Sequence, residues 1–119
     1  MNRKELVRSY KEAVKPAGVF RIVHIATGKS LVGTSPDVPA MLNRYRFQLD
    51  HGSHPDKDLQ SDWQAFGAEA FSFETLDLLK PTEEPNPDIA EDLRVLKDLW
   101  MEKLEGTEVS MYPFSKRKS

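Results

Sequence analysis

The residues best suited to contact a phosphate group lie between positions 44 and 57. Arg46, His51, His54 and Lys57 cluster there, at the end of one expected helix and in the loop after it. Cationic and imidazole side chains can bind the phosphate backbone, which receives most protein–DNA hydrogen bonds. A solvated basic surface is an equally good interpretation of the same four residues.

Tyrosine and histidine offer two other kinds of chemistry. The Tyr45 hydroxyl could act as a base or bind phosphate, although an amphipathic tyrosine packed into the core is the commoner case. His24, His51 and His54 lack a convincing metal-ligand spacing, so we expect no zinc site. The chain contains no cysteine, which excludes disulfides, thiolate metal sites and a cysteine nucleophile.

Charge is distributed unevenly over the 119 residues, whose net charge is −2. Residues 18–57 carry five basic side chains, including Lys29, against three acidic ones, whereas residues 74–92 carry seven acidic side chains against one lysine. If nucleic acid binds, the first region is the better candidate. No apolar run approaches the roughly 20 residues that span a bilayer, and no signal peptide is evident. We therefore expect a cytoplasmic protein without a membrane partner.

Periodicity predicts the elements that position these residues. Two strands over residues 18–25 and 30–33 form a hairpin around the turn at 26–29, and alternation over 71–76 predicts a third strand. Helical spacing predicts four helices, over residues 3–14, 36–50, 55–66 and 86–104. This order predicts an α+β fold, with a small three-stranded antiparallel sheet flanked by helices.

Proline and apolar spacing define two of these helices further. Ser35 as a cap and Pro36 at the first helical position predict the start of the helix that runs to about Asp50. Pro55 is expected to open the next helix, with Leu59, Trp63 and Phe66 as its buried face. The basic end of the chain, Lys116-Arg117-Lys118, is expected to be mobile.

Two segments share the spacing of a known family. GVFRIVHIATGKSLVG, residues 18–33, begins with Gly18-Val19-Phe20 and ends with Leu31-Val32-Gly33. LQSDWQAFG, residues 59–67, precedes FSFETL, residues 71–76, and Trp100 lies on the last helix. This pattern resembles the GIY-YIG nuclease family over roughly residues 18–104. It implies a single domain in which residues 1–17 add an N-terminal helix and residues 105–119 form a tail.

The resemblance implies metal-assisted hydrolysis of a phosphodiester. In the family, the first-motif Tyr helps to activate water and the second Tyr supports the site. An Arg on the following helix stabilises phosphate charge, and a Glu on the last helix holds a divalent metal. A base, a cation and a hard carboxylate are the groups that this reaction requires.

This chain departs from the family at each of these positions. Phe20 cannot take or relay a proton, and protonated Lys97 would repel a metal. We therefore expect no cofactor, with Mg²⁺ needed only if the chain is active, and hydrolysis weakened or lost. The substituted positions are, in family order, Phe20, Leu31, Met41 and Lys97.

Other residues are candidate replacements for the lost groups. Arg44 follows Met41 by three residues and could bring a guanidinium to the same helical face, unless it is simply solvent-exposed. Tyr45 occupies the position of a family His. Lys97 could bind a phosphate directly, without a metal, or be a surface lysine. A shifted helix register would instead bring Glu91 or Glu102 to the site.

Two hypotheses follow from these residues. In the first, the chain binds nucleic acid, DNA rather than RNA, through the hairpin and the helix 36–50, and is a DNA endonuclease if active. In the second, it is a non-catalytic protein-interaction or regulatory module on the same fold. A basic surface around Phe20, Leu31, Arg44 and Lys97 would favour nucleic acid, and an apolar or acidic one a protein partner.

Overall fold

The described part of the chain forms one sheet with helices on both sides. A computed structural model describes residues 16–79, 89–105 and 110–116, so the helix expected over 3–14 and the expected helix start at 86 lie outside it. In chain order the elements are β1 (Gly18–His24), β2 (Ser30–Ser35), α2 (Val38–Asp50), α3 (Lys57–Phe66), η1 (Ala68–Ala70), β3 (Phe71–Leu78), α4 (Ile89–Glu105) and η2 (Pro113–Lys116). None of the described helices has the length and apolarity needed to cross a membrane.

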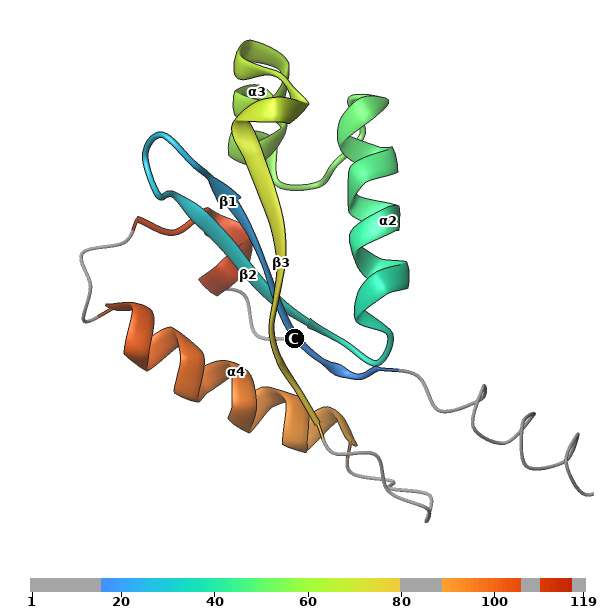
Figure 1. Cartoon of the computed structure of the whole chain (residues 1–119), viewed down its shortest axis with the longest axis vertical. Helices are drawn as coiled ribbons and strands as arrows, with labels where there is room; N and C mark the ends of the chain where they lie inside the picture. Colours follow the sequence, from blue (N-terminus) through green and yellow to red (C-terminus); the bar gives the residue numbers. More distant parts are fainter. Residues whose placement is uncertain (1–15, 80–88, 106–109, 117–119) are drawn as a thin grey trace, which may run out of the picture.

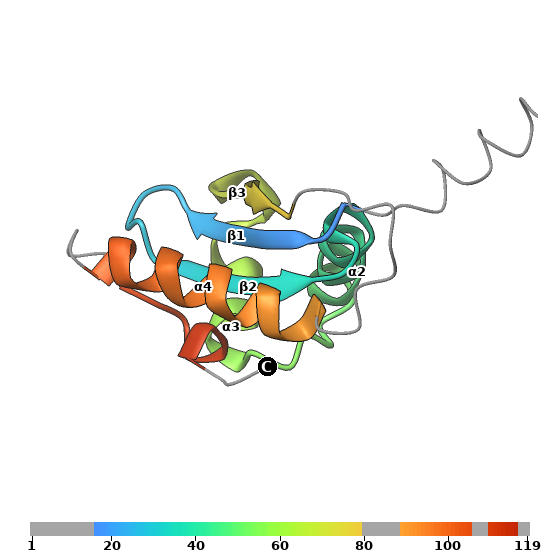
Figure 2. The same ribbon diagram turned by 90° about the horizontal axis from the view of Figure 1, so that it is seen from below.

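The sheet has the order β2-β1-β3, and β1 pairs antiparallel with both neighbours. Because side chains alternate along a strand, Phe20 and Ile22 point to one face while Val19 and Arg21 point to the other. Helices α2 and α3 cover the first face, and α4 covers the second (Figures 1 and 2). The predicted α+β fold, with a three-stranded antiparallel sheet flanked by helices, is confirmed.

Each face of the sheet has its own buried layer. On the α4 side, Val19 and Val32 are fully buried. Among the α4 residues whose burial is described, Leu93 and Lys97 are buried, and they lie one helical turn apart. Trp100 of α4 is half-buried and donates a hydrogen bond from Nε1 to Asp77 Oδ2 at 3.3 Å. The layer on the side of α2 and α3 is larger and consists of Phe20, Ile22, Leu31, Val38, Leu49, Leu59, Trp63, Phe71 and Tyr112.

The two motif glycines are required by close packing. A Cβ atom on Gly18 would lie 2.0 Å from the carbonyl oxygen of Asp77, where β1 and β3 approach each other beside an irregularity in their pairing. A Cβ atom on Gly33, which pairs with Phe20, would lie 2.6 Å from Phe20 Cζ. Gly18 therefore leaves room for the neighbouring strand β3, and Gly33 leaves room for the Phe20 ring.

Helix α2 begins later than the sequence predicts. Its first residue is Val38, and Asp37 caps it by accepting a hydrogen bond from the Ala40 backbone N–H at 3.3 Å. The predicted start at Pro36 is therefore wrong by two residues. A carboxylate just ahead of the first turn satisfies a free N–H group, which Pro36 cannot do.

Helix α3 also begins two residues after its expected start at Pro55. The side chain of Asp56 accepts hydrogen bonds from the first backbone N–H groups of the helix, so Asp56 is the cap. Leu59 and Trp63 are buried as predicted, but Phe66 is 60% exposed. Phe66 is the last residue of the helix, and its ring centroid lies 4.8 Å from that of His24, the last residue of β1.

The end of the chain docks onto the edge strand β2. Residues 110–116 belong to the segment that the sequence predicts to be a tail, yet Ser30 N–H donates to Ser110 O at 2.9 Å and Tyr112 N–H donates to Ser30 O at 2.8 Å. Tyr112 is fully buried, and its hydroxyl donates to Asp62 Oδ2 at 2.7 Å. These residues of the predicted tail therefore pack against the sheet and cover backbone groups that an edge strand would expose.

Candidate functional site

Three of the four substituted family positions lie together in the layer between the sheet and α2. Phe20 is 1% exposed, and its ring meets that of Tyr45 edge to face with centroids 5.5 Å apart. Leu31 is fully buried in the same cluster, and Met41 packs against it. Where the family has hydroxyl and guanidinium groups, this chain has apolar contacts.

The fourth position lies across the sheet from the other three. Lys97 is only 8% exposed on the sheet-facing side of α4. Burial lowers the pKa of its ammonium group, while the charge of Asp98 opposes that shift. A phosphate bound at the surface would have little access to Lys97, contrary to the expectation of direct contact. Glu91 and Glu102, the carboxylates of the register alternative, are exposed on α4, and Glu91 pairs with Arg94.

The half-buried Tyr45, whose ring contacts Phe20, forms an aromatic pair with the buried His54. Their ring centroids are 4.6 Å apart, edge to face. Burial raises the pKa of the Tyr45 phenol, and the charge of Arg44 only partly offsets this effect. Tyr45 therefore keeps its proton at neutral pH, which is the wrong state for a base.

His54 does not belong to the exposed basic surface in which the sequence groups it. It is 4% exposed, and its Nδ1 accepts a hydrogen bond from the Asp56 backbone N–H at 3.0 Å. Burial lowers its pKa, with Asp56 opposing the shift, so the neutral imidazole is favoured. Within the described part of the chain, its Nε2 has no hydrogen-bond partner. His54 is thus a structural residue of the loop between α2 and α3.

The remaining basic candidates are exposed or half-exposed but do not form one cluster. Arg44 is exposed on the outer face of α2, and His51 is the exposed residue that caps the C-terminus of this helix. Arg46 lies at its flank, with the guanidinium 4.8 Å above the Phe73 ring of β3. Lys29 lies at the edge of β2, with Nζ 4.6 Å from the centre of the Tyr112 ring.

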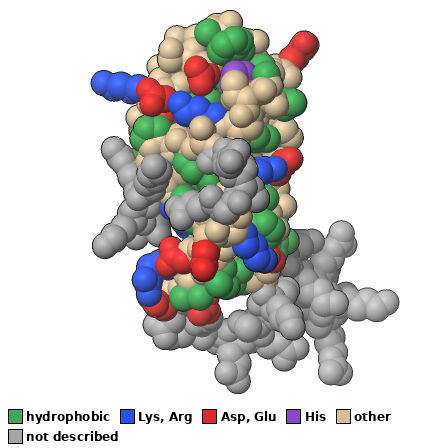
Figure 3. All heavy atoms as spheres, turned by 90° about the vertical axis from the view of Figure 1, so that its left-hand side faces the viewer, with side chains coloured by type: hydrophobic (Ala, Val, Ile, Leu, Met, Phe, Trp, Pro, Cys, Tyr) green, Lys and Arg blue, Asp and Glu red, His purple; other side chains and the backbone are tan. Residues whose placement is uncertain are grey.

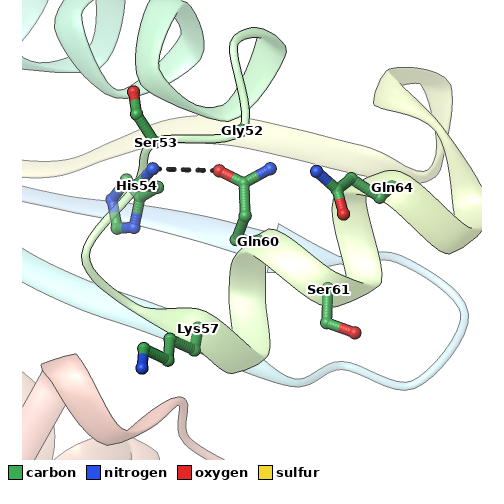
Figure 4. A pocket seen from close by; sticks show the side chains of 7 residues that line it. All are labelled: Gly52, Ser53, His54, Lys57, Gln60, Ser61 and Gln64. Atoms are coloured by element: carbon green, nitrogen blue, oxygen red, sulfur yellow. Dashed lines mark hydrogen bonds between the residues drawn. The ribbon is translucent and has the colours of Figure 1, made fainter.

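Lys57 borders a polar hollow of about 380 Å³ at the loop between α2 and α3 (Figure 4). Gln60 lines this hollow. Its side chain accepts a hydrogen bond from the His54 backbone N–H at 3.0 Å and donates one to Leu49 O at 2.9 Å. Lys57 is the one residue of the lining with a permanent positive charge. The lining consists of Gly52, Ser53, His54, Lys57, Gln60, Ser61 and Gln64.

Phe47 is an exposed aromatic residue that the sequence reading does not single out. It is 62% exposed, and its ring stacks on the His51 imidazole with centroids 4.1 Å apart. The sequence carries one signal of this exposure: Phe47 falls outside the apolar stripe of its own helix. That stripe consists of Val38, Met41, Leu42, Tyr45 and Leu49.

The residues present do not fit the divalent metal of the nuclease family. Phenylalanine, leucine and methionine offer no oxygen ligand, and the buried Lys97 carries the same sign of charge as the metal. Among the described residues, no group of three or more histidine, aspartate or glutamate side chains is arranged to hold a metal ion. We therefore derive no catalytic step that uses a metal.

The sheet order, the two helical layers and the hairpin with its two glycines define a GIY-YIG-like fold, as the sequence resemblance predicted. The chain is similar to the solved catalytic domain of the homing endonuclease I-TevI, with a TM-score of 0.62 and 20% identity, over 81% of this chain and 95% of that one. A mutant of the same catalytic domain matches with a TM-score of 0.62 and 19% identity, over 87% and 97%. No family model and no curated protein matches the chain. At these identities the likeness establishes the fold.

Proposed function

We propose that this chain binds nucleic acid, DNA rather than RNA, and that phosphodiester hydrolysis by the GIY-YIG mechanism is weakened or lost. One observation carries the proposal. On a nuclease-like fold, three of the four family positions are filled by core side chains, and the fourth is a lysine across the sheet.

The substitutions remove the groups that the reaction needs. Without a hydroxyl, Phe20 cannot assist proton transfer, which typically contributes about 10²–10⁴-fold to a rate. With Lys97 in place of a carboxylate, the chain also lacks a metal ligand at that position. The effects of residues that act as a unit are not additive, so the loss need not equal the product of the separate losses.

Surface charge supports α2 as the side that binds. Arg44, Arg46 and His51 lie on or beside its exposed surface, and Asp50, the one carboxylate of α2, accepts a hydrogen bond from Trp63 Nε1 at 3.2 Å. On the side of the molecule where α4 ends, acidic, basic and apolar side chains are intermixed (Figure 3). A face of mixed charge attracts a polyanion less than a basic one.

The test is a binding and cleavage panel on the full chain. Single-stranded DNA, duplex DNA and RNA are each incubated with Mg²⁺, with Mn²⁺ and with EDTA. Binding without cleavage is the expected result. Arg44→Ala should weaken binding and lower the slope of log affinity against log salt by about one, because one phosphate contact is lost.

Lys103→Ala is the matched control, because it removes one exposed positive charge from α4 and should leave binding unchanged. Cleavage that requires a metal and disappears in Arg44→Ala would show a rewired active site. That result would overturn the proposed loss of hydrolysis.

A second candidate function is a protein-interaction or regulatory module. It is favoured by Val95 and Leu99, which are 47% and 51% exposed one turn apart on α4, among charges of both signs. If the chain binds no nucleic acid at low salt, the protein-interaction module becomes the favoured function. In that case, Leu99→Ala rather than Arg44→Ala should weaken association with a partner.

A further inference from the structure

We propose that Phe47 and His51 form a stacking platform for an unpaired base, so that the chain prefers single-stranded nucleic acid or an unpaired segment of a duplex. The platform lies on the outer face of α2, away from the substituted family positions. This inference rests on the proposed nucleic-acid binding and specifies which form of nucleic acid is bound.

The first argument is the exposure and order of the pair. Phe47 is 62% exposed, so its ring is accessible to a binding partner. The two rings are stacked, with an interplanar angle of only 28° and centroids 4.1 Å apart, so a base could extend an existing stack by adding to an outer ring face. His51 Nδ1 donates to the Phe47 carbonyl oxygen at 2.8 Å, which fixes the imidazole against its neighbour.

The second argument is the position of the positive charge. Arg44, Phe47 and His51 are spaced by three and then four residues, so they follow one another along a single face of α2. A guanidinium one turn from the platform is within reach of the phosphate that flanks a stacked base. Arg46 adds a second cation at the side of the helix, above Phe73.

The third argument distinguishes unpaired from paired bases. Stacking on an aromatic side chain needs a free base face, which a base inside a duplex does not offer. Apolar contact alone would suit a protein partner equally well. The alternation of cation and exposed ring along α2 is instead the combination that single-strand binders use to track a backbone and hold its bases.

The experiment measures the affinity of the full chain for an oligonucleotide of about 12 nucleotides that carries one 2-aminopurine, and for a duplex of the same sequence. Phe47→Ala should weaken single-strand binding about 5- to 100-fold and abolish the stacking-induced change in 2-aminopurine fluorescence. The affinity of Phe47→Ala for the duplex should stay within about twofold of the wild-type affinity. Phe47→Trp should restore both single-strand signals, because it keeps a flat aromatic surface.

Two controls separate this inference from the function on which it rests. Leu99→Ala removes an exposed apolar side chain from α4 and should change nothing, and Arg44→Ala should weaken binding to both forms. The stacking platform is contradicted if Arg44→Ala weakens binding but Phe47→Ala does not. It is also contradicted if Phe47→Ala weakens single-strand and duplex binding equally. In either case the proposal that the chain binds nucleic acid still stands. If the wild-type chain binds neither form at low salt, both proposals are wrong.

Discussion

At the scale of the residue, His54 shows how a backbone contact decides the state of a side chain. Its Nδ1 accepts from the Asp56 N–H, so this nitrogen cannot carry a proton while the loop between α2 and α3 keeps its shape. The rings of Tyr45 and Phe114 lie beside it, with centroids 4.6 and 5.9 Å away. A protonated imidazole would lose the hydrogen bond and place a charge in a buried site.

The pH dependence of stability follows from this arrangement. Burial lowers the pKa of His54 in the folded chain, whereas the unfolded chain has the ordinary value of about 6.5. Between these two values the unfolded state binds more protons, so the free energy of unfolding should fall as the pH drops below about 6.5. Urea unfolding from about pH 7.5 to 5 measures this decrease.

His54→Asn should remove most of the decrease between about pH 6.5 and 5, because its amide oxygen can still accept from Asp56 N–H and does not titrate. If the variant and the wild-type chain lose stability in parallel, His54 is not the group responsible.

At the scale of the element, the strand contacts at Gly18 and Gly33 differ in kind. An added methyl group at Gly18 would meet the backbone of β3, which cannot move without breaking strand pairing. An added methyl group at Gly33 would meet the far end of the Phe20 ring, which can move only by displacing other buried side chains. The hairpin therefore depends on both glycines, but for different reasons.

This difference predicts an order of stability. Gly33→Ala should destabilise by about 1–3 kcal/mol, as overpacking in a core usually does. Gly18→Ala should destabilise by more, because a backbone atom lies in the way. Thermal unfolding with hydrogen exchange of β3 amides measures both effects, and equal losses would contradict the argument.

The elements show where sequence reasoning succeeds and where it fails. Alternation and helical spacing predicted the strands and helices because the buried faces repeat, as Leu59 and Trp63 do. Helix starts at Pro36 and Pro55 were wrong because aspartate caps lie just beyond these prolines. The local pattern of a segment could not reveal contacts made across the fold.

The candidate site was predictable to a similar extent. The substitutions at Phe20, Leu31, Met41 and Lys97 are visible in the sequence alone. Their separation into two layers on opposite sides of the sheet depends on tertiary packing, and so does the burial of His54. The docking of residues 110–116 was not predictable either, because backbone groups make most of those contacts and no periodic pattern marks them.

At the scale of the whole molecule, Asp56 joins three parts of the fold. Its Oδ1 caps α3, its backbone N–H holds His54, and its Oδ2 accepts from the Phe114 N–H at 2.9 Å. At the docked end of the chain, the Ser115 hydroxyl oxygen in turn accepts a hydrogen bond from the Val32 N–H at 2.8 Å. Through these contacts the loop between α2 and α3 is tied to the edge of the sheet.

Asp56→Asn should keep the cap of α3 but remove the hydrogen bond to the Phe114 N–H. The amide oxygen can keep the cap of α3, but the amide nitrogen cannot accept from Phe114 N–H. We expect the cap to survive. Residues 110–116 should open about 10- to 150-fold more often, because a hydrogen bond to a carboxylate is lost.

Hydrogen exchange at the Val32 amide reports this opening, with the α3 amides as the internal control. Unchanged exchange at Val32, or equal acceleration in α3, would show that Asp56 does not hold the end of the chain.

The packing of Phe20 over Gly33 has a consequence for how such chains are recognised. The glycine is required by the ring beneath which it lies, whether or not that ring carries a hydroxyl. A motif defined by its glycines and their spacing therefore reports backbone geometry, and a chain can satisfy it after its chemistry has been replaced. Sequence searches that score the hydroxyl and carboxylate positions separately from the glycines would distinguish active nucleases from proteins that keep only the fold.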